Sequence, residues 1–286
     1  MKKIQSFLSL AMFLFFVLPY LLSNFKDIGS GFSKVNSFSD DHLVQKILSS
    51  DRVKSDAANL TQLATKLFYK IQYDWRSGGE RFHSDWHLYK KWLRESTAFR
   101  MKIKSTYNSN YPHSIQVAAP YGIVDQGYYD TAAWGWVYHQ IFKKDANRIN
   151  NIAAAFAYYE KKLGLSKHQL ATLMLNFVQS IPYKVPQNNI GLYTPFEVLD
   201  RATGDCDSKS LLYYILLRKM GIDAVILVSR HYKHAMVGVD VTTGGEFFPA
   251  FYKRFYFTEV TGKGHRIGGL PAQSGDKKRW YAVKIN

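Results

Sequence analysis

The sequence contains a single cysteine among its 286 residues. One thiol excludes an intramolecular disulfide, a Cys-x-x-Cys redox pair and any zinc site built on several thiolates. Only eight prolines and nineteen glycines occur, with no fixed period, which excludes a collagen-like or linker-dominated chain. Hydrophobic residues make up 47% of the chain, too many for an intrinsically disordered protein, so we expect a globular fold.

Acidic residues are also scarce. The 22 Asp and Glu residues face 38 Lys and Arg residues, which gives a net charge of +16. Such a charge could serve an anionic polymer or a lipid surface. The basic residues are scattered, however, and the sequence carries no signature of a known nucleic-acid-binding module. We therefore interpret the charge as a generally basic surface and expect no nucleic-acid partner.

The N-terminus has the layout of an export signal. Lys2 and Lys3 precede an apolar stretch over residues 7–22, which is short for a helix that spans a bilayer. We predict that residues 1–24 are a signal peptide or an uncleaved signal anchor. The rest of the chain is then exported, to the periplasm or the outside of the cell, with anchoring to the inner membrane as the alternative to cleavage.

The first half of the chain is less informative than the second. Residues 25–39 are polar and indicate a linker, and apolar steps of three and four over residues 40–71 predict helices. Residues 72–125 show no clear period. Residues 130–139 hold Trp134, Trp136 and Tyr138, which either line a sugar or peptide groove or, more commonly, pack in a core. We assign residues 25–144 to a linker and a mainly helical N-terminal region.

Helices are followed by strands in the second half. The pattern predicts helices over residues 147–163, 166–178, 194–199 and 209–220, the second capped by Ser166 and the third opened by Thr194 and Pro195. Strands are predicted over residues 223–229, 234–241, 255–260 and 281–285. This order indicates an α+β fold with an antiparallel sheet. We assign residues 145–286 to a catalytic domain.

Cys206 lies in the segment Gly204-Asp205-Cys206-Asp207-Ser208, where a strong helix begins. Free N–H groups and the helix dipole favour a thiolate there, so the pKa of the thiol is expected to fall. Asp205 and Asp207 are expected to cap the helix or to face outward. A strand beginning at His234 follows the helix, in the order needed to set an imidazole beside the thiol.

Five segments in this order resemble the transglutaminase-like superfamily, whose fold is related to that of papain-like cysteine proteases. The resemblance covers residues 145–271. Glu259 stands where many members have Asp, and Met236 stands where many have Trp. The segments are residues 177–183, 194–199, 204–210, 234–239 and 256–262.

The resemblance implies a catalytic triad in which Cys206 is the nucleophile, His234 the base and Glu259 the group that orients the histidine. The implied reaction is acyl transfer through a thioester, by a peptidase, amidase or acyltransferase acting on a peptide or protein. The Cys206 backbone N–H is one expected oxyanion donor, and the second is Gln179 or Tyr183. Neither a metal nor an organic cofactor is expected.

Other interpretations of these residues exist. A non-catalytic binding module at the cell envelope could keep the same fold. His231 competes with His234 as the base, and His265 could line the cleft. Asp240 shares a strand face with His234, but six residues of extended strand span about 20 Å, so we predict that Glu259 orients the ring. Residues 83–87 alternate possible metal ligands, although a solvated segment is favoured.

Overall fold

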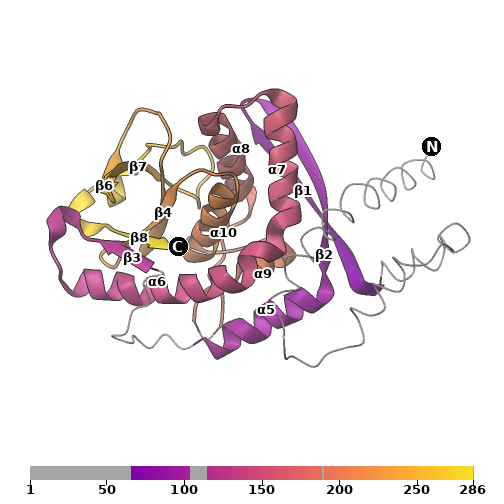
Figure 1. Cartoon of the computed structure of the whole chain (residues 1–286), viewed down its shortest axis with the longest axis horizontal. Coiled ribbons are helices and arrows are strands. Elements are labelled where there is room, and N and C mark those ends of the chain that lie inside the picture. Colours follow the sequence, from indigo (N-terminus) through magenta and orange to yellow (C-terminus); the bar gives the residue numbers. More distant parts are fainter. Residues whose placement is uncertain (1–65, 104–114, 189, 286) are drawn as a thin grey trace, which may run out of the picture. The chain divides into compact units, whose positions relative to one another are not determined.

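The computed structural model describes residues 66–103, 115–188 and 190–285, which are coloured in Figure 1. These residues form an α+β fold with helices and an antiparallel sheet, as the sequence predicts. The helices are α5 (Lys90–Lys102), α6 (Gln126–Asp145), α7 (Asn150–Leu163), α8 (Lys167–Ser180), α9 (Pro195–Arg201) and α10 (Cys206–Lys219). Four short 3-10 helices also occur, at Pro120–Gly122, Ala146–Ile149, Ala272–Ser274 and Lys277–Arg279.

The strands form two sheets. They are β1 (Phe68–Ser77), β2 (Glu80–Tyr89), β3 (Ile115–Ala118), β4 (Ala224–Ser229), β5 (His234–Val239), β6 (Phe247–Ala250), β7 (Lys253–Thr258) and β8 (Tyr281–Ile285). The first two pair with each other, and the other six form one sheet in the order β3-β8-β4-β5-β7-β6. Every pairing in this sheet is antiparallel. The C-terminal strand β8 lies between β3 and β4.

The β1–β2 hairpin corrects the end of the segment predicted to be helical, because β1 already begins at Phe68; residues 40–65 of that segment lie outside the described residues. Gly78 and Gly79 form its turn, with φ of 59° and 84°, and a two-residue turn of this kind needs positive φ at both positions. Polar and apolar residues alternate on both sides of the turn, and Tyr73, Trp75 and Trp86 are buried. Over residues 68–71 the period of two outweighs the three- and four-residue steps, because it places one face of each strand in the core.

Helix α10 lies between the large sheet and α8, as Figure 1 shows. Its residues 208–217 are all buried, and burying each large apolar side chain among them stabilises the fold by about 1.5–3 kcal/mol. The start of α10 is thereby held rigidly against the sheet. Strands β4 and β5 contact the helix directly, and the backbone N–H of Ala235, near the start of β5, reaches Cys206 in its first turn.

The helix starts predicted at Ser166 and Thr194 are confirmed. Each side chain accepts a hydrogen bond from the backbone N–H three residues on, and Gln169 and Glu197 complete the two capping boxes. Glu197 is fully buried and also pairs with Arg100 of α5, at 2.7 Å from Nε. A local capping motif therefore also fixes a contact between distant parts of the chain.

Residues 67–286 form one compact unit. Helix α6 packs on β8 and β3, and α5 packs on α9. The described elements before residue 145 therefore share their packing with those that follow, and the predicted limit between residues 144 and 145 falls inside this unit. None of the described helices combines the length and hydropathy needed to cross a bilayer. The apolar segment at residues 7–22 lies outside the described residues.

Candidate active site

Cys206 is the first residue of α10. Asp205 caps the helix by accepting a hydrogen bond from the backbone N–H of Ser208, at 3.0 Å. This part of the prediction for the two aspartates is confirmed. Cys206 itself is buried, with 5% of its surface exposed, although the residues on both sides of it are aspartates. Burial follows because β5 packs directly across the first turn of the helix.

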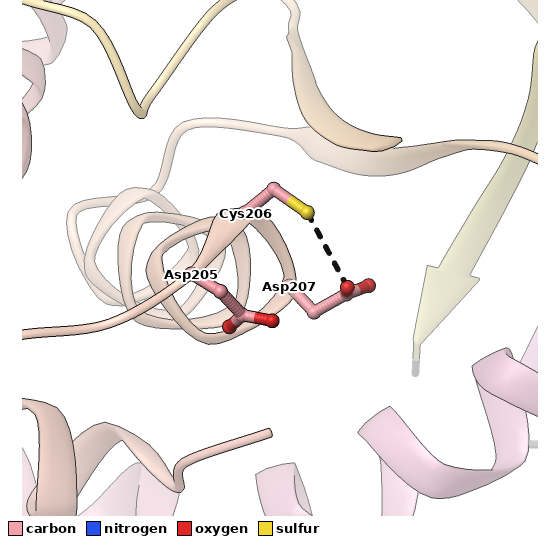
Figure 2. A group of neighbouring side chains, drawn as sticks. All are labelled: Asp205, Cys206 and Asp207. Carbon is pink, nitrogen blue, oxygen red and sulfur yellow. Dashed lines mark hydrogen bonds between the residues drawn. The ribbon is translucent and has the colours of Figure 1, made fainter. Parts of the chain in front are cut away.

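The thiol has two polar neighbours. Its S–H donates to Oδ2 of Asp207 at 3.4 Å (Figure 2). The backbone N–H of Ala235, in β5, donates to the sulfur. Asp207 was expected to cap the helix or to face outward, but its carboxylate is turned toward the thiol. Its second carboxylate oxygen accepts a hydrogen bond from the Tyr138 hydroxyl of α6.

The pKa of the Cys206 thiol is raised, not lowered as the helix start suggested. Burial is the main cause, and the nearby carboxylates of Asp207 and then Asp205 add to it. The Ala235 N–H acts in the opposite direction but is outweighed. Burial also raises the pKa of the Asp207 carboxyl group.

His234 and Glu259 are in direct contact. His234 opens β5, Glu259 directly follows β7, and these two strands are neighbours in the sheet. The distance from His234 Nε2 to Glu259 Oε2 is 2.7 Å. Backbone and hydroxyl groups of Thr261 donate to the other oxygen of Glu259, which fixes the carboxylate from behind.

This contact determines which ring nitrogen can act as a base. Burial alone would raise the pKa of Glu259, but its hydrogen bond and charge interaction with His234 and the Thr261 bonds lower it to about 2. An ionised carboxylate only accepts hydrogen bonds, so Nε2 of His234 carries the proton that is shared with it. In a neutral imidazole the other nitrogen, Nδ1, is then the unprotonated one.

The competing groups have other partners. Asp240 accepts a hydrogen bond from Lys253 at 2.7 Å, at the far end of β5 from His234. The ring of His231 lies against Tyr232. His265 lines a hollow beside the His234–Glu259 pair, as was expected for a cleft residue. The structure thus brings Glu259, and not Asp240, to the histidine.

Gln179 does not have the free donor that an oxyanion hole needs. Its amide nitrogen donates to the backbone oxygens of Glu259 and His265, at 2.7 and 2.9 Å. Both amide hydrogens are therefore used, which argues against the predicted oxyanion role. Gln179 instead ties the end of α8 to the segment that carries Glu259.

Tyr183 is placed differently. It forms a bridge with Gly204, two residues before Cys206, and about half of its surface is exposed. Burial raises the pKa of its hydroxyl, and the charges of Cys206 and the neighbouring aspartates add to this effect. The Tyr183 hydroxyl therefore lies within electrostatic range of the thiol.

A hollow of about 320 Å³ lies beside the His234–Glu259 pair. A larger hollow, of about 450 Å³, surrounds the turn between β6 and β7 and contains none of the predicted site residues. The smaller one is the better candidate for a substrate cleft. Its lining residues are Tyr232, His234, Glu259, Thr261, Gly262, His265, Pro271, Gln273 and Ser274.

The sequence did not place two further residues, Tyr138 and Lys209, at this site. The distance along the chain between Tyr138 and Asp207 is 69 residues, and only the packing of α6 brings the tyrosine to the carboxylate. Lys209 is fully buried one turn into α10, and its Nζ donates to the Ile181 oxygen at 2.7 Å and to the Thr261 oxygen at 3.4 Å. Lysine is rarely buried, and the residues around Lys209 in the sequence do not indicate that it is.

The described residues include two groups of side chains that could in principle bind a metal ion, and both are already hydrogen-bonded. Oxygens of Asp205 and Asp207 and the sulfur of Cys206 lie within 4.8 Å of one another, but hydrogen bonds to Ser208, Tyr138 and each other already engage them. His83 lies in exposed contact with Asp74 and Asp85 across the hairpin. The absence of a metal or cofactor stays a prediction.

Comparison with known proteins gives little beyond the geometry. No family model and no curated protein matches the chain. The crystal structure of a proposed cysteine protease from Cytophaga hutchinsonii is similar over 78% of this chain and 72% of that chain, with 12% sequence identity and a TM-score of 0.29. Function is therefore argued from the site alone.

Proposed function

We propose that the protein is a cysteine-dependent amide hydrolase or acyltransferase with a transglutaminase-like, papain-related catalytic core. The contact between His234 and Glu259 beside the start of the Cys206 helix carries this proposal. It supplies what a thiol nucleophile needs: a base whose tautomer is set by a third group, next to a thiol that is part of a rigid element. Peptides or proteins are the proposed substrates.

The proposed reaction forms and hydrolyses a thioester. The proton of the Cys206 thiol passes to Nδ1 of His234 while the sulfur attacks the amide carbon and the carbonyl electrons move to oxygen. The imidazolium then returns that proton to the leaving amine as the tetrahedral intermediate collapses. Water or a second amine attacks the thioester, which gives hydrolysis or transamidation respectively.

The oxyanion of the tetrahedral intermediate needs donors. The Cys206 backbone N–H is in the first turn of α10, where N–H groups have no partner within the helix. Tyr183 is the proposed second donor, since its hydroxyl lies near the thiol and the amide of Gln179 is already used.

A second candidate function is a binding module that has kept this fold without turnover. The raised pKa of the Cys206 thiol favours it, because a buried, protonated thiol is a poor nucleophile. The His234–Glu259 contact favours the enzyme, because a binding surface has no need of an oriented imidazole.

The test is a peptide-library digestion by the full-length protein, with and without an added primary amine, read by mass spectrometry. We expect cleaved or deamidated peptides, or amine adducts, with the wild type and none with Cys206→Ala. Circular dichroism of the variant checks that it is folded. Equal turnover by the alanine variant would show that Cys206 is not the nucleophile, and no product from either protein over the whole library would support the binding module.

A further inference from the structure

Asp207 is the carboxylate in closest contact with the proposed nucleophile, and another element fixes its orientation. One oxygen accepts the S–H of Cys206 at 3.4 Å, and the other accepts the hydroxyl of Tyr138. Tyr138 lies in α6 with none of its surface exposed, so its ring cannot turn away. Figure 2 shows the Asp207 carboxylate turned to the sulfur, and Asp205 accepts its own hydrogen bonds from Ser208.

The charges around the thiol come from several elements. The start of α10 supplies the carboxylates of its cap Asp205 and of Asp207, and the segment after α8 supplies the hydroxyl of Tyr183. The β5 strand supplies the Ala235 N–H and the His234 ring, and Glu259 holds that ring from beyond β7.

A buried cation lies in the same helix but faces elsewhere. The ammonium of Lys209 donates to the backbone oxygens of Ile181 and Thr261. The balance at the sulfur in the free protein is therefore against a thiolate, and His234 is the neighbour able to receive the thiol proton.

Resting on the proposed role of Cys206, we propose that Asp207, oriented by Tyr138, holds Cys206 as a neutral thiol in the free protein and makes its activation depend on proton transfer to His234 during attack. The S–H bond breaks as the S–C bond forms, and the proton goes to Nδ1 of His234. The carboxylate opposes an isolated thiolate but attracts the imidazolium that forms, since the charges of Asp207 and His234 interact favourably. Asp207 thus suppresses reaction with adventitious electrophiles while leaving the concerted route open.

The experiment measures alkylation of Cys206 by iodoacetamide from pH 5.5 to about 10.5 in the full-length protein. Cys206 is the only cysteine, so all thiol labelling reports on it. The midpoint of the rate profile follows ionisation of the thiol, whatever the absolute rate. We expect the wild-type midpoint above the ordinary value for cysteine. Asp207→Asn should lower the midpoint by about one pH unit or more, which is about tenfold faster labelling at neutral pH.

Asp205→Asn is the matched control. It removes an equal charge from the residue on the other side of Cys206, and asparagine caps a helix as well as aspartate does. Its midpoint should shift less than that of Asp207→Asn, because the Asp205 carboxylate is hydrogen-bonded to Ser208 and its charge has the smaller effect on the thiol. Tyr138→Phe, which frees the Asp207 carboxylate to turn away, should give a smaller shift in the same direction.

Two results would overturn the proposal: an unchanged midpoint in folded Asp207→Asn, or an equal or larger shift in Asp205→Asn. If Asp207→Asn does not fold, an unshifted midpoint in Tyr138→Phe contradicts the proposal. The alkylation profile needs no substrate. Failure of the proposed function, shown by turnover in Cys206→Ala, is therefore a separate observation from failure of this inference.

Discussion

The two carboxylates considered as partners of His234, Glu259 and Asp240, bond to different residues. Glu259 bonds to the histidine at 2.7 Å, whereas Asp240 bonds to Lys253 at 2.7 Å. We predict that Glu259→Gln lowers kcat by about 10²- to 10⁴-fold, because the amide no longer selects the tautomer that leaves Nδ1 free. Asp240→Asn should change kcat by less than about threefold.

The measurement is steady-state turnover on whichever peptide the library identifies, with thermal unfolding as the check on folding. The low pKa of Glu259 also means that its ionised form stabilises the fold above about pH 4.5 and that this contribution is lost as the pH falls toward 2. Glu259→Gln should therefore flatten the acid limb of the stability curve. Collapse of activity in Asp240→Asn with survival in Glu259→Gln would require a different triad.

The residue types at the site could be read from the sequence, but their environment could not. The unique thiol before a helix and the strand histidine were recognisable from local pattern. The inward turn of Asp207 and the occupied amide of Gln179 depend on Tyr138 and Glu259, 69 and 80 positions away, and the burial of Cys206 depends on strand β5. A local pattern carries no information about such partners.

Helix α10 contains a fully buried lysine, Lys209. Burial lowers the pKa of Lys209 to about 8, from 10.5 in an exposed lysine. Between about pH 8 and 10.5 the unfolded chain therefore binds more protons at this position than the folded one does. The free energy of unfolding rises with pH over that window, and the penalty for burying the charge is fully present below it.

We predict that Lys209→Met removes this rise. The check is urea unfolding at pH 7, 9 and 10.5, with Lys161→Met on the exposed surface of α7 as the control. At pH 7 the variant loses two hydrogen bonds to backbone oxygens but also the cost of burying a charge, so its stability should stay within about 2 kcal/mol of the wild type. The same pH dependence in Lys209→Met and wild type would assign the rise to other groups.

Elements with a long regular pattern were predicted and irregular ones were not. The apolar run of α10 and the strands β4, β5 and β8 were found because a period of 3.6 or 2 persists over them. The β1–β2 hairpin carried its own signal, Gly78-Gly79 between alternating runs, which the mixed charges and aromatics around it obscured. The four residues of β3 and of β6 are too short to show a period.

At the scale of the whole molecule, export is the prediction that stays open. It rests on Lys2 and Lys3 before the apolar residues 7–22. A reporter enzyme that is active only outside the cytoplasm, fused after Asn286, should be active in bacteria that produce the full-length chain. Its activity should fall at least tenfold when residues 2–24 are deleted. An inactive reporter on the full-length chain, with the fusion intact on a blot, would contradict export.

The sequence by itself determined the α+β class, the helix caps and the order of thiol, imidazole and carboxylate along the chain. Each depends on residues close in sequence, through hydrogen bonds and side-chain periods of one turn or one strand. Only the tertiary structure decided that β8 lies between β3 and β4, that the Glu259 carboxylate bonds to Nε2 of His234 and that Asp207 accepts a hydrogen bond from the thiol. These depend on which apolar faces pack together, because burial acts on surfaces assembled from distant segments and sets both the contacts and the pKa values there.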